Sequence, residues 1–194
     1  MTVRVVRSRD DVVRAAGRLF AERGYHGTSM RDLAAELGLL GSSLYSHITS
    51  KEDLLVEVVE RGGSLFHASA ARAVNIGGAA ADRLTALVAG HIDVVLDHFD
   101  EVRTFLNEAS ALDQSHRSRV LAARNRYESA FRQVLEEGKG DGSFNPDLDP
   151  KLAAIFILSI LNALERWYRP SGQVDRKELV GRILEFTTSG IGVP

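Results

Sequence analysis

The sequence predicts an all-α protein of about nine helices, and three observations support this. Apolar residues recur at intervals of three and four along most of the 194-residue chain, which is the spacing of one helix face. The breaks between these segments carry Gly, Pro, Asn and Asp, as in Asn75-Ile76-Gly77-Gly78. The β-branched residues are dispersed at helical spacing, so no convincing strand and no internal repeat emerges.

The first predicted helix spans residues 9–23, where Val12, Ala16, Leu19 and Phe20 follow helical spacing before Gly24 ends it. The arm before it carries Arg4 and Arg7. Together with Arg9, these arginines either reach DNA phosphates or a minor groove, or belong to a solvated tail.

The segment from Thr28 to Lys51 predicts two short helices and the start of a third. Ser29 followed by Asp32 fits a capping box, and Gly38 fits a helix end. A second short helix begins at Ser42, with Leu44 and Ile48 four residues apart and facing inward together. These proportions are those of a helix-turn-helix.

A long helix is predicted from Lys51 to Val74, opened by a second capping box between Ser50 and Asp53. The Gly62-Gly63 pair weakens its interior, so the pair allows either a bend or close packing against another helix.

Four further helices are predicted beyond residue 78. They span residues 82–99, 100–112, 115–138 and 175–188. Residues 138–150 form the longest turn-forming stretch, and its GxGxG has no strand before it, so we interpret it as turns and not as a nucleotide cradle.

The most apolar helix follows Pro150 and runs to Tyr168. Its first part is apolar nearly all round, which indicates burial on more than one side. In a chain of this size that favours burial against a partner subunit in a homodimer. Candidates for the buried face are Ile155, Ile157, Leu158 and Leu161.

The short helix after Ser42 is the argument for DNA binding. A helix that enters a major groove about 12 Å wide needs a slim face able to form hydrogen bonds. Ser42, Ser43 and Ser46 supply that face and are expected nearest the base edges. Tyr45, His47 and Lys51 flank it with donors suited to phosphates.

Charge is distributed in agreement with this interpretation. The formal net charge of the chain is −2, yet residues 1–51 hold 8 Lys and Arg against 5 Asp and Glu, a balance of +3. The remainder holds 16 against 21, a balance of −5. A basic head on an acidic body suits a protein that touches DNA at one end only.

The same stretch resembles the DNA-binding segment of TetR-family transcriptional repressors. The family pattern stands here as Thr28, Ser29, Leu33, Ala34 and Gly38, then Leu44-Tyr45-Ser46-His47-Ile48, then Lys51-Glu52-Asp53-Leu54. Ile48 replaces the usual aromatic residue, and Leu40 occupies a turn position that is often small or polar. The resemblance implies a three-helix head that contacts double-stranded operator DNA through Thr28, Ser29, Arg31, Ser42, Ser43, Tyr45, Ser46, His47 and Lys51.

Catalytic and metal-binding patterns are not found in the sequence. There are no cysteines, which excludes disulfides, thiolate catalysis and zinc fingers, and there is no GxSxG, HExxH or paired ExxH. His91 and His98 lie two helical turns apart, but a structural or pocket role is favoured over a metal site. We therefore expect no catalytic residues, no metal and no cofactor. Without a run of about 18 apolar residues or a signal region, the chain is expected to be cytoplasmic and not membrane-bound.

The C-terminal body contains a cluster of large polar and aromatic side chains at Asn162 and at residues 165–170, including the single Trp. Trp167 and Tyr168 either close the core, with Arg166 and Arg169 at the helix end where cations are favoured, or form the mouth of a ligand pocket. This cluster and residues 144–150 resemble a subgroup of TetR-family repressors that respond to acyl-CoA thioesters and control fatty-acid or sterol-ring breakdown. Pocket candidates are Leu87, His91, Leu106, Asn107, Glu108, Phe131, Asn162, Arg166, Trp167 and Arg169.

These observations predict a helix-turn-helix domain over residues 1–50 and a ligand-binding and dimerisation domain over residues 51–194. The predicted function is ligand-responsive repression, in which a small apolar effector, such as an acyl-CoA thioester, releases the protein from a palindromic operator. The alternative is a small-molecule-binding helical dimer without DNA binding. An enzyme is not expected.

Overall fold

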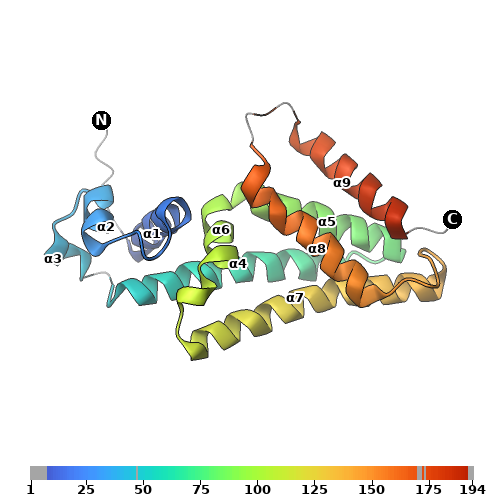
Figure 1. Ribbon diagram of the computed structural model, residues 1–194, viewed down its shortest axis with the longest axis horizontal. Helices are drawn as coiled ribbons and strands as arrows, with labels where there is room; N and C mark the ends of the chain where they lie inside the picture. Colours follow the sequence, from blue (N-terminus) through green and yellow to red (C-terminus); the bar gives the residue numbers. More distant parts are fainter. Residues whose placement is uncertain (1–7, 47, 170–171, 173, 192–194) are drawn as a thin grey trace. The chain divides into compact units, whose positions relative to one another are not determined.

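The computed structural model describes residues 8–46, 48–169, 172 and 174–191, and this part of the chain is all-helical, as predicted (Figure 1). It contains nine α-helices and one short 3₁₀ helix, η1, with no strand among the described residues. Their bounds are α1 (Arg9–Arg23), α2 (Met30–Leu37), α3 (Gly41–Leu44), α4 (Lys51–Val74), α5 (Ala80–Asp97), α6 (Phe99–Asn107), η1 (Ala109–Ala111), α7 (Gln114–Asp141), α8 (Pro150–Trp167) and α9 (Arg176–Ile191).

The chain packs as two compact units. The first runs from the N-terminal helices to Ser64 and includes His98–Leu121, and the second contains Leu65–Asp97 and the chain from Ala122 onward. Helices α4 and α7 contribute residues to both units. Packing units of this kind do not test the predicted functional boundary near residue 50.

In the first unit, the helix ends lie where the capping residues predict. The Ser29 hydroxyl accepts a hydrogen bond from Asp32 N while the Asp32 carboxylate accepts one from Ser29 N, a complete capping box at the start of α2. Gly38 ends α2 in the left-handed region, at φ 66° and ψ 28°, which Gly enters without steric cost. Helix α1 packs against both α2 and α6.

Also in the first unit, α4 passes through Gly62 and Gly63 without a break, and of the two expectations for this pair the structure supports close packing. A Cβ atom at Gly62 would lie 2.7 Å from the Glu101 carbonyl oxygen and 2.8 Å from Phe105 Cβ. The missing side chain therefore lets the backbone of α6 approach α4 closely.

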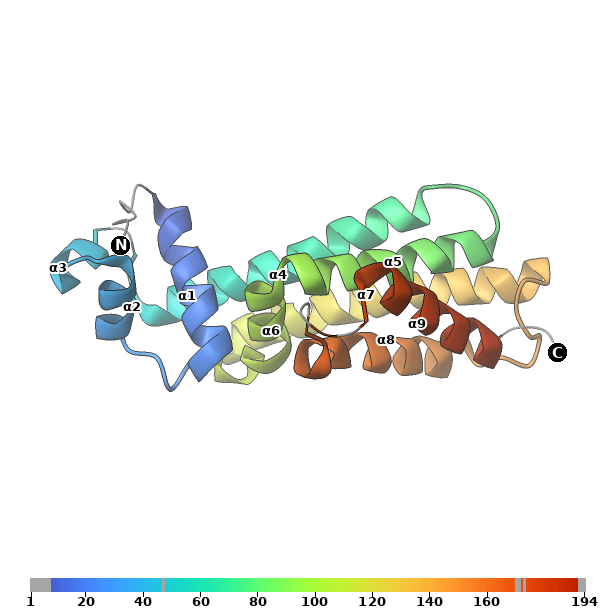
Figure 2. The ribbon, with the colours of Figure 1, turned by 90° about the horizontal axis from the view of Figure 1, so that it is seen from above.

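In the second unit, α5 lies alongside α8 and α9 (Figures 1 and 2). Helix α8 begins at Pro150, as expected, with Asp149 as its N-cap: the Asp149 carboxylate accepts hydrogen bonds from Lys151 N at 2.9 Å and Leu152 N at 3.0 Å.

The prediction that turns begin at Gly138 is wrong, because α7 continues to Asp141. Gly138 serves a packing contact instead: a Cβ atom there would lie 2.1 Å from the Phe144 ring. The chain leaves the helix at Gly142, which has a φ of 81°.

Candidate nucleic-acid interface and effector site

The exposed face of α3 and of the residues after it carries small hydroxyls and one phenol. Ser42, Ser43 and Ser46 are exposed, and Tyr45 is 57% exposed, while Leu44 and Ile48 are buried at 0% and 4%. This is the division into inward and outward side chains that the spacing predicts, but the predicted single helix through Leu44 and Ile48 is wrong, because α3 begins at Gly41 and ends at Leu44. His47 lies outside the described residues.

The Thr28 side chain is not at the surface, where a DNA contact would require it. Its side chain is buried, and its hydroxyl lies 3.2 Å from the Leu19 carbonyl oxygen and 3.0 Å from that of Gly24. Because this buried hydroxyl donates to main-chain carbonyls, it stabilises the turn between α1 and α2. We therefore correct the role of the Thr28 side chain from contact to support.

Lys51 is bound to the same turn. Its ammonium donates hydrogen bonds to the carbonyl oxygens of Tyr25, at 2.9 Å, and Thr28, at 2.8 Å. It also lies 4.1 Å from the centre of the Tyr25 ring, within cation–π range. An ammonium has three N–H donors, so these two bonds leave one N–H for a further acceptor.

The start of α2 places Ser29 and Arg31 at the surface. Ser29 holds the capping box, and its hydrogen bonds keep the pKa of the Asp32 carboxyl below its usual value. Negative charge at a helix N-terminus is favourable, so Asp32 and Ser29 fix the start of this helix. The Arg31 side chain extends from the first turn of α2.

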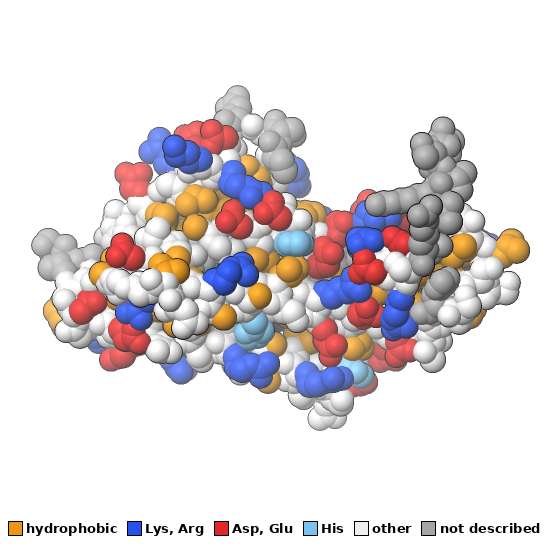
Figure 3. Space-filling model, turned by 180° about the vertical axis from the view of Figure 1, so that it is seen from behind, with side chains coloured by type: hydrophobic (Ala, Val, Ile, Leu, Met, Phe, Trp, Pro, Cys, Tyr) orange, Lys and Arg blue, Asp and Glu red, His pale blue; other side chains and the backbone are white. Residues whose placement is uncertain are grey.

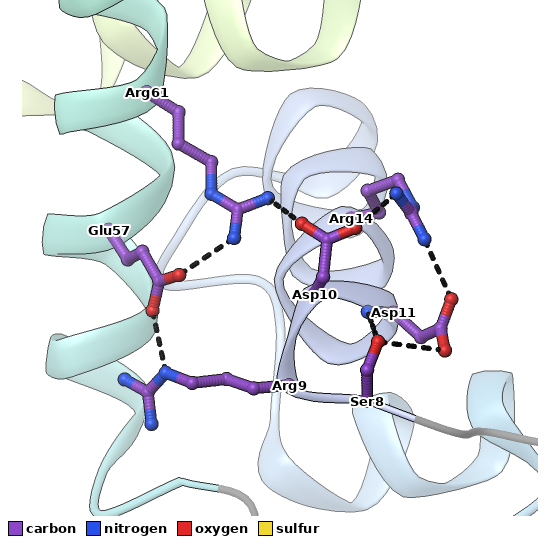
Figure 4. A network of polar contacts seen from close by, with 7 residues as sticks. All are labelled: Ser8, Arg9, Asp10, Asp11, Arg14, Glu57 and Arg61. Atoms are coloured by element: carbon purple, nitrogen blue, oxygen red, sulfur yellow. Dashed lines mark hydrogen bonds and ion pairs between the residues drawn. The ribbon is translucent and has the colours of Figure 1, made fainter.

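A network of ion pairs joins α1 to the first half of α4 (Figure 4). Arg61 on α4 contacts Asp10 and Glu57, and Arg9 on α1 donates to Glu57 at 2.9 Å. Arg14 pairs with Asp10 and Asp11 at the start of α1. Exposed pairs contribute little singly, but this network connects α1 to α4 through several shared contacts.

Basic and acidic side chains alternate on the face of the molecule shown in Figure 3, with no broad field of one sign among the described side chains drawn there. Among the residues that the structure describes, no group of three or more His, Asp or Glu side chains is placed to hold a metal ion. No helix in the part of the chain that the structure describes is long and apolar enough to cross a membrane.

A second cluster lies in the second unit and is built from aromatic rings on three helices. The His91 ring on α5 lies 4.7 Å from the Phe66 ring on α4 and 5.8 Å from the Tyr127 ring on α7, centre to centre. Phe131, one turn after Tyr127, lies 5.5 Å from it. His91 Nδ1 and the Tyr127 hydroxyl are 3.1 Å apart, and both side chains are buried.

Three of the predicted effector residues belong to this unit's interior: Leu87, His91 and Phe131 are all buried. Sequence reasoning missed Phe66 and Tyr127. The i, i+4 spacing of Tyr127 and Phe131 was an available signal for an aromatic face on α7.

Leu106, Asn107 and Glu108 lie instead in the first unit. The Glu108 carboxylate accepts a hydrogen bond from Tyr25 N at 3.0 Å, and the Asn107 amide donates to the Arg103 carbonyl oxygen at 2.9 Å. Glu108 therefore binds the turn between α1 and α2, and the effector contacts of these three residues stay a prediction.

At the end of α8, one aromatic side chain closes the core and the other is exposed, so each of the two expectations for this segment fits one residue. Tyr168 is buried and closes the core, and its hydroxyl donates to the Val174 carbonyl oxygen at 3.2 Å. Trp167 is 55% exposed, and the Arg166 side chain is 75% exposed beside Glu165. Arg169 is exposed and Asn162 half-buried.

Two family models match this chain. One, described as bacterial regulatory proteins of the tetR family, matches residues 12–58, and the other, described as tetracyclin repressor-like C-terminal domain, matches residues 77–191. The second match alone covers more than half of the chain. The chain belongs to the TetR family. It is a DNA-binding transcriptional repressor with a ligand-binding domain, and the match to the head counts against the alternative of a dimer without DNA binding.

Relatives of this TetR-family chain agree with that assignment. The HTH-type transcriptional repressor KstR2 of Rhodococcus jostii is 30% identical over 187 residues, which are 96% of this chain and 92% of the relative. The structure of the ketosteroid transcriptional regulator KstR2 of Mycobacterium tuberculosis superposes with a TM-score of 0.91, at 29% identity and 98% coverage of both chains. AibR, solved in complex with isovaleryl coenzyme A and operator DNA, superposes with a TM-score of 0.83, at 25% identity, covering 92% of this chain and 96% of its own.

We predict that the buried His91 makes this repressor less stable in mild acid. Burial lowers the pKa of His91 to about 3, while an unfolded histidine has a pKa near 6.5. Between these two pKa values the histidine is protonated in the unfolded state and neutral in the folded state. The contribution of neutral His91 to the unfolding free energy is therefore fully present above about pH 6.5 and is lost as the pH falls toward 3. At pH 5 this loss is about 2 kcal/mol.

Urea unfolding at pH 7 and pH 5 measures this loss. The decrease in unfolding free energy should be about 2 kcal/mol smaller in His91→Phe than in the wild type. His26→Phe, which removes an exposed imidazole, should behave as the wild type does. Equal decreases in wild type and His91→Phe would contradict a neutral buried His91.

Proposed function

We propose that this repressor binds a palindromic operator as a homodimer and is released by an apolar effector of the acyl-CoA thioester class. Two heads related by a two-fold axis read half-sites about one helical turn of DNA apart, or a multiple of it. The observation that supports base reading is the exposed face of Ser42, Ser43 and Ser46 beside buried Leu44 and Ile48. Arg31, Tyr45 and the third N–H of Lys51 are the proposed phosphate donors, and His47 remains in the proposed set from its place in the family pattern.

The dimer is proposed to form through α8 and α9. Phe156 is 62% exposed on α8 and Phe186 is 69% exposed on α9, and Leu152 and Ile155 are also exposed. Large apolar side chains gathered on two helices of one unit suit burial against a second copy. Ile157 and Leu161, expected at this interface, are buried within the chain itself and are removed from it.

The effector class is proposed from two parts of the second unit, its aromatic cluster and the end of α8. Phe66, His91, Tyr127 and Phe131 offer an apolar interior with a polar pair, which suits an acyl group. Arg166 and Arg169 are exposed beside Trp167 and suit the phosphates of coenzyme A. The AibR complex with isovaleryl coenzyme A provides a precedent in a protein of the same fold.

Release requires that the effector bind one arrangement of the heads better than the other. Helix α4 begins beside the reading segment at Lys51 and contributes Phe66 to the aromatic cluster, so it carries residues of both proposed sites. We propose that effector entry displaces α4 and changes the distance between the two reading helices. The repressor acts on chromosomal DNA, so we place it in the cytoplasm.

Replacing Lys51 by Met tests the phosphate contact. Loss of one phosphate contact should weaken binding to all DNA sequences and reduce the slope of log K against log salt by about one. The variant should also unfold at a lower temperature, because two carbonyls lose their donor. Lys177→Met, an exposed change on α9, should alter neither property.

The salt slope separates the two roles of Lys51. A lower melting temperature with an unchanged salt slope would make Lys51 a structural residue only. Operator titrations monitored by fluorescence anisotropy at several salt concentrations give this slope.

Replacing Phe156 and Phe186 together by Glu tests the dimer. Two charges on each copy of an apolar interface should convert dimers to monomers at micromolar concentration, as measured by sedimentation velocity. Leu121→Glu, which changes another apolar side chain that is 59% exposed, should leave the dimer intact. A double variant that stays dimeric at nanomolar concentration would reject this interface.

Titration of acyl-CoAs into the repressor–operator complex tests the effector. Thioesters of varied chain length and ring content should release DNA at micromolar concentration, and Arg166→Met should raise the required concentration about tenfold. Arg72→Met, which changes an exposed arginine on α4, is the matched control. If no acyl-CoA releases the operator, the effector class is wrong. If Arg166→Met responds as the wild type does, Arg166 has no part in the site.

A further inference from the structure

The aromatic cluster of the second unit contains a polar pair whose hydrogen bonding is incomplete. His91 is 1% exposed, and its Nδ1 lies 3.1 Å from the Tyr127 hydroxyl oxygen. The other ring nitrogen, Nε2, is buried and has no hydrogen-bond partner among the described residues. Buried polar atoms are nearly always satisfied in folded proteins, so one left open inside an apolar cluster indicates a missing partner.

The contact with Tyr127 decides which nitrogen carries the proton. A neutral imidazole has one N–H donor and one acceptor nitrogen. If Nδ1 donated to Tyr127, both the tyrosine hydrogen and the Nε2 lone pair would lack a partner within the described part of the chain. If Tyr127 donates to Nδ1, only the Nε2–H is left over. The second arrangement leaves fewer buried groups unsatisfied and is favoured.

The open group is therefore a single, neutral hydrogen-bond donor beside the Phe66 and Tyr127 rings. A carboxylate placed there would be buried against one uncharged N–H, which does not compensate its desolvation. A hydroxyl would bring a proton of its own that needs an acceptor. A carbonyl oxygen accepts without bringing a proton, so it matches this donor best.

We propose that His91 Nε2–H binds a neutral carbonyl oxygen on the apolar part of the effector, with Phe66, Tyr127 and Phe131 packing the hydrocarbon around it. This rests on the proposed function only in taking the second unit as the effector site. It adds that the effector carries a ketone or similar carbonyl at a distance from its anionic group. Tyr127 is the positioning residue, because its hydroxyl fixes the tautomer of His91.

The test uses two probes of the same shape, 1-tetralone, which has one carbonyl group, and tetralin, which has none. In the full-length protein with ¹⁵N-labelled histidine, long-range ¹H–¹⁵N spectra at pH 7 should show His91 protonated at Nε2 and not at Nδ1. Addition of 1-tetralone should shift the His91 Nε2 resonance saturably, and tetralin should not. His91→Phe identifies the resonance and should weaken binding of 1-tetralone about tenfold, with binding of tetralin unchanged.

Tyr127→Phe keeps the ring and removes only the hydroxyl, so it should weaken 1-tetralone and leave tetralin unchanged. A histidine protonated at Nδ1 in the free wild type would overturn the proposal. Equal shifts with both probes, no binding of 1-tetralone, or unchanged affinity in His91→Phe would also overturn it. The wild-type spectra decide the question even if a variant does not fold.

Operator release is measured separately. If acyl-CoAs release DNA while 1-tetralone leaves His91 unchanged, the carbonyl site is rejected and the proposed function stands. If 1-tetralone binds at His91 while no acyl-CoA releases DNA, the site stands and the effector class is rejected.

Discussion

The ammonium of Lys51 binds the carbonyls of Tyr25 and Thr28, and this contact joins the turn between α1 and α2 to the first residue of α4. Thr28 completes it from within the turn, and Glu108 accepts the Tyr25 amide from the end of α6. Main-chain groups of this partly buried turn gain from such partners, because buried polar groups without a partner are costly. The direction in which α2 and α3 leave the turn therefore depends on three side chains that are distant in sequence.

The ion pairs between α1 and α4 and the close approach of α6 at Gly62 act on the same body of helices. One is electrostatic and screened by salt, and the other is steric and independent of salt. The head thus has two kinds of restraint on α4. This combination keeps α1, α4 and α6 in contact when the ionic strength changes.

Much of this could be predicted from local sequence. The Ser29–Asp32 capping box, Gly38 and Pro150 act through neighbours within four residues, so the start and end of α2 and the start of α8 followed from the pattern. The burial of Leu44 and Ile48 among exposed neighbours followed from it as well. The roles of Thr28, Lys51 and Glu108 did not, since their partners lie up to 83 residues away. A family pattern marks such residues without saying whether they touch a ligand or hold the fold. Tyr127 was missed for the same reason, because its partner His91 is on another helix.

Helix α3 has four residues and an exposed Leu40 at its N-cap, where no side-chain acceptor is available. It is anchored by the buried Leu44, and the Ser46 hydroxyl donates a hydrogen bond to the Ser43 carbonyl oxygen at its end, while the exposed Ser42 side chain has no such part among the described contacts. Substitution of the exposed Ser42 is therefore expected to leave the folded core intact. The proposed base-reading position at Ser42 is thus separate from the buried Leu44 that anchors the helix, so single substitutions there are expected to change the proposed target site without an unstable intermediate.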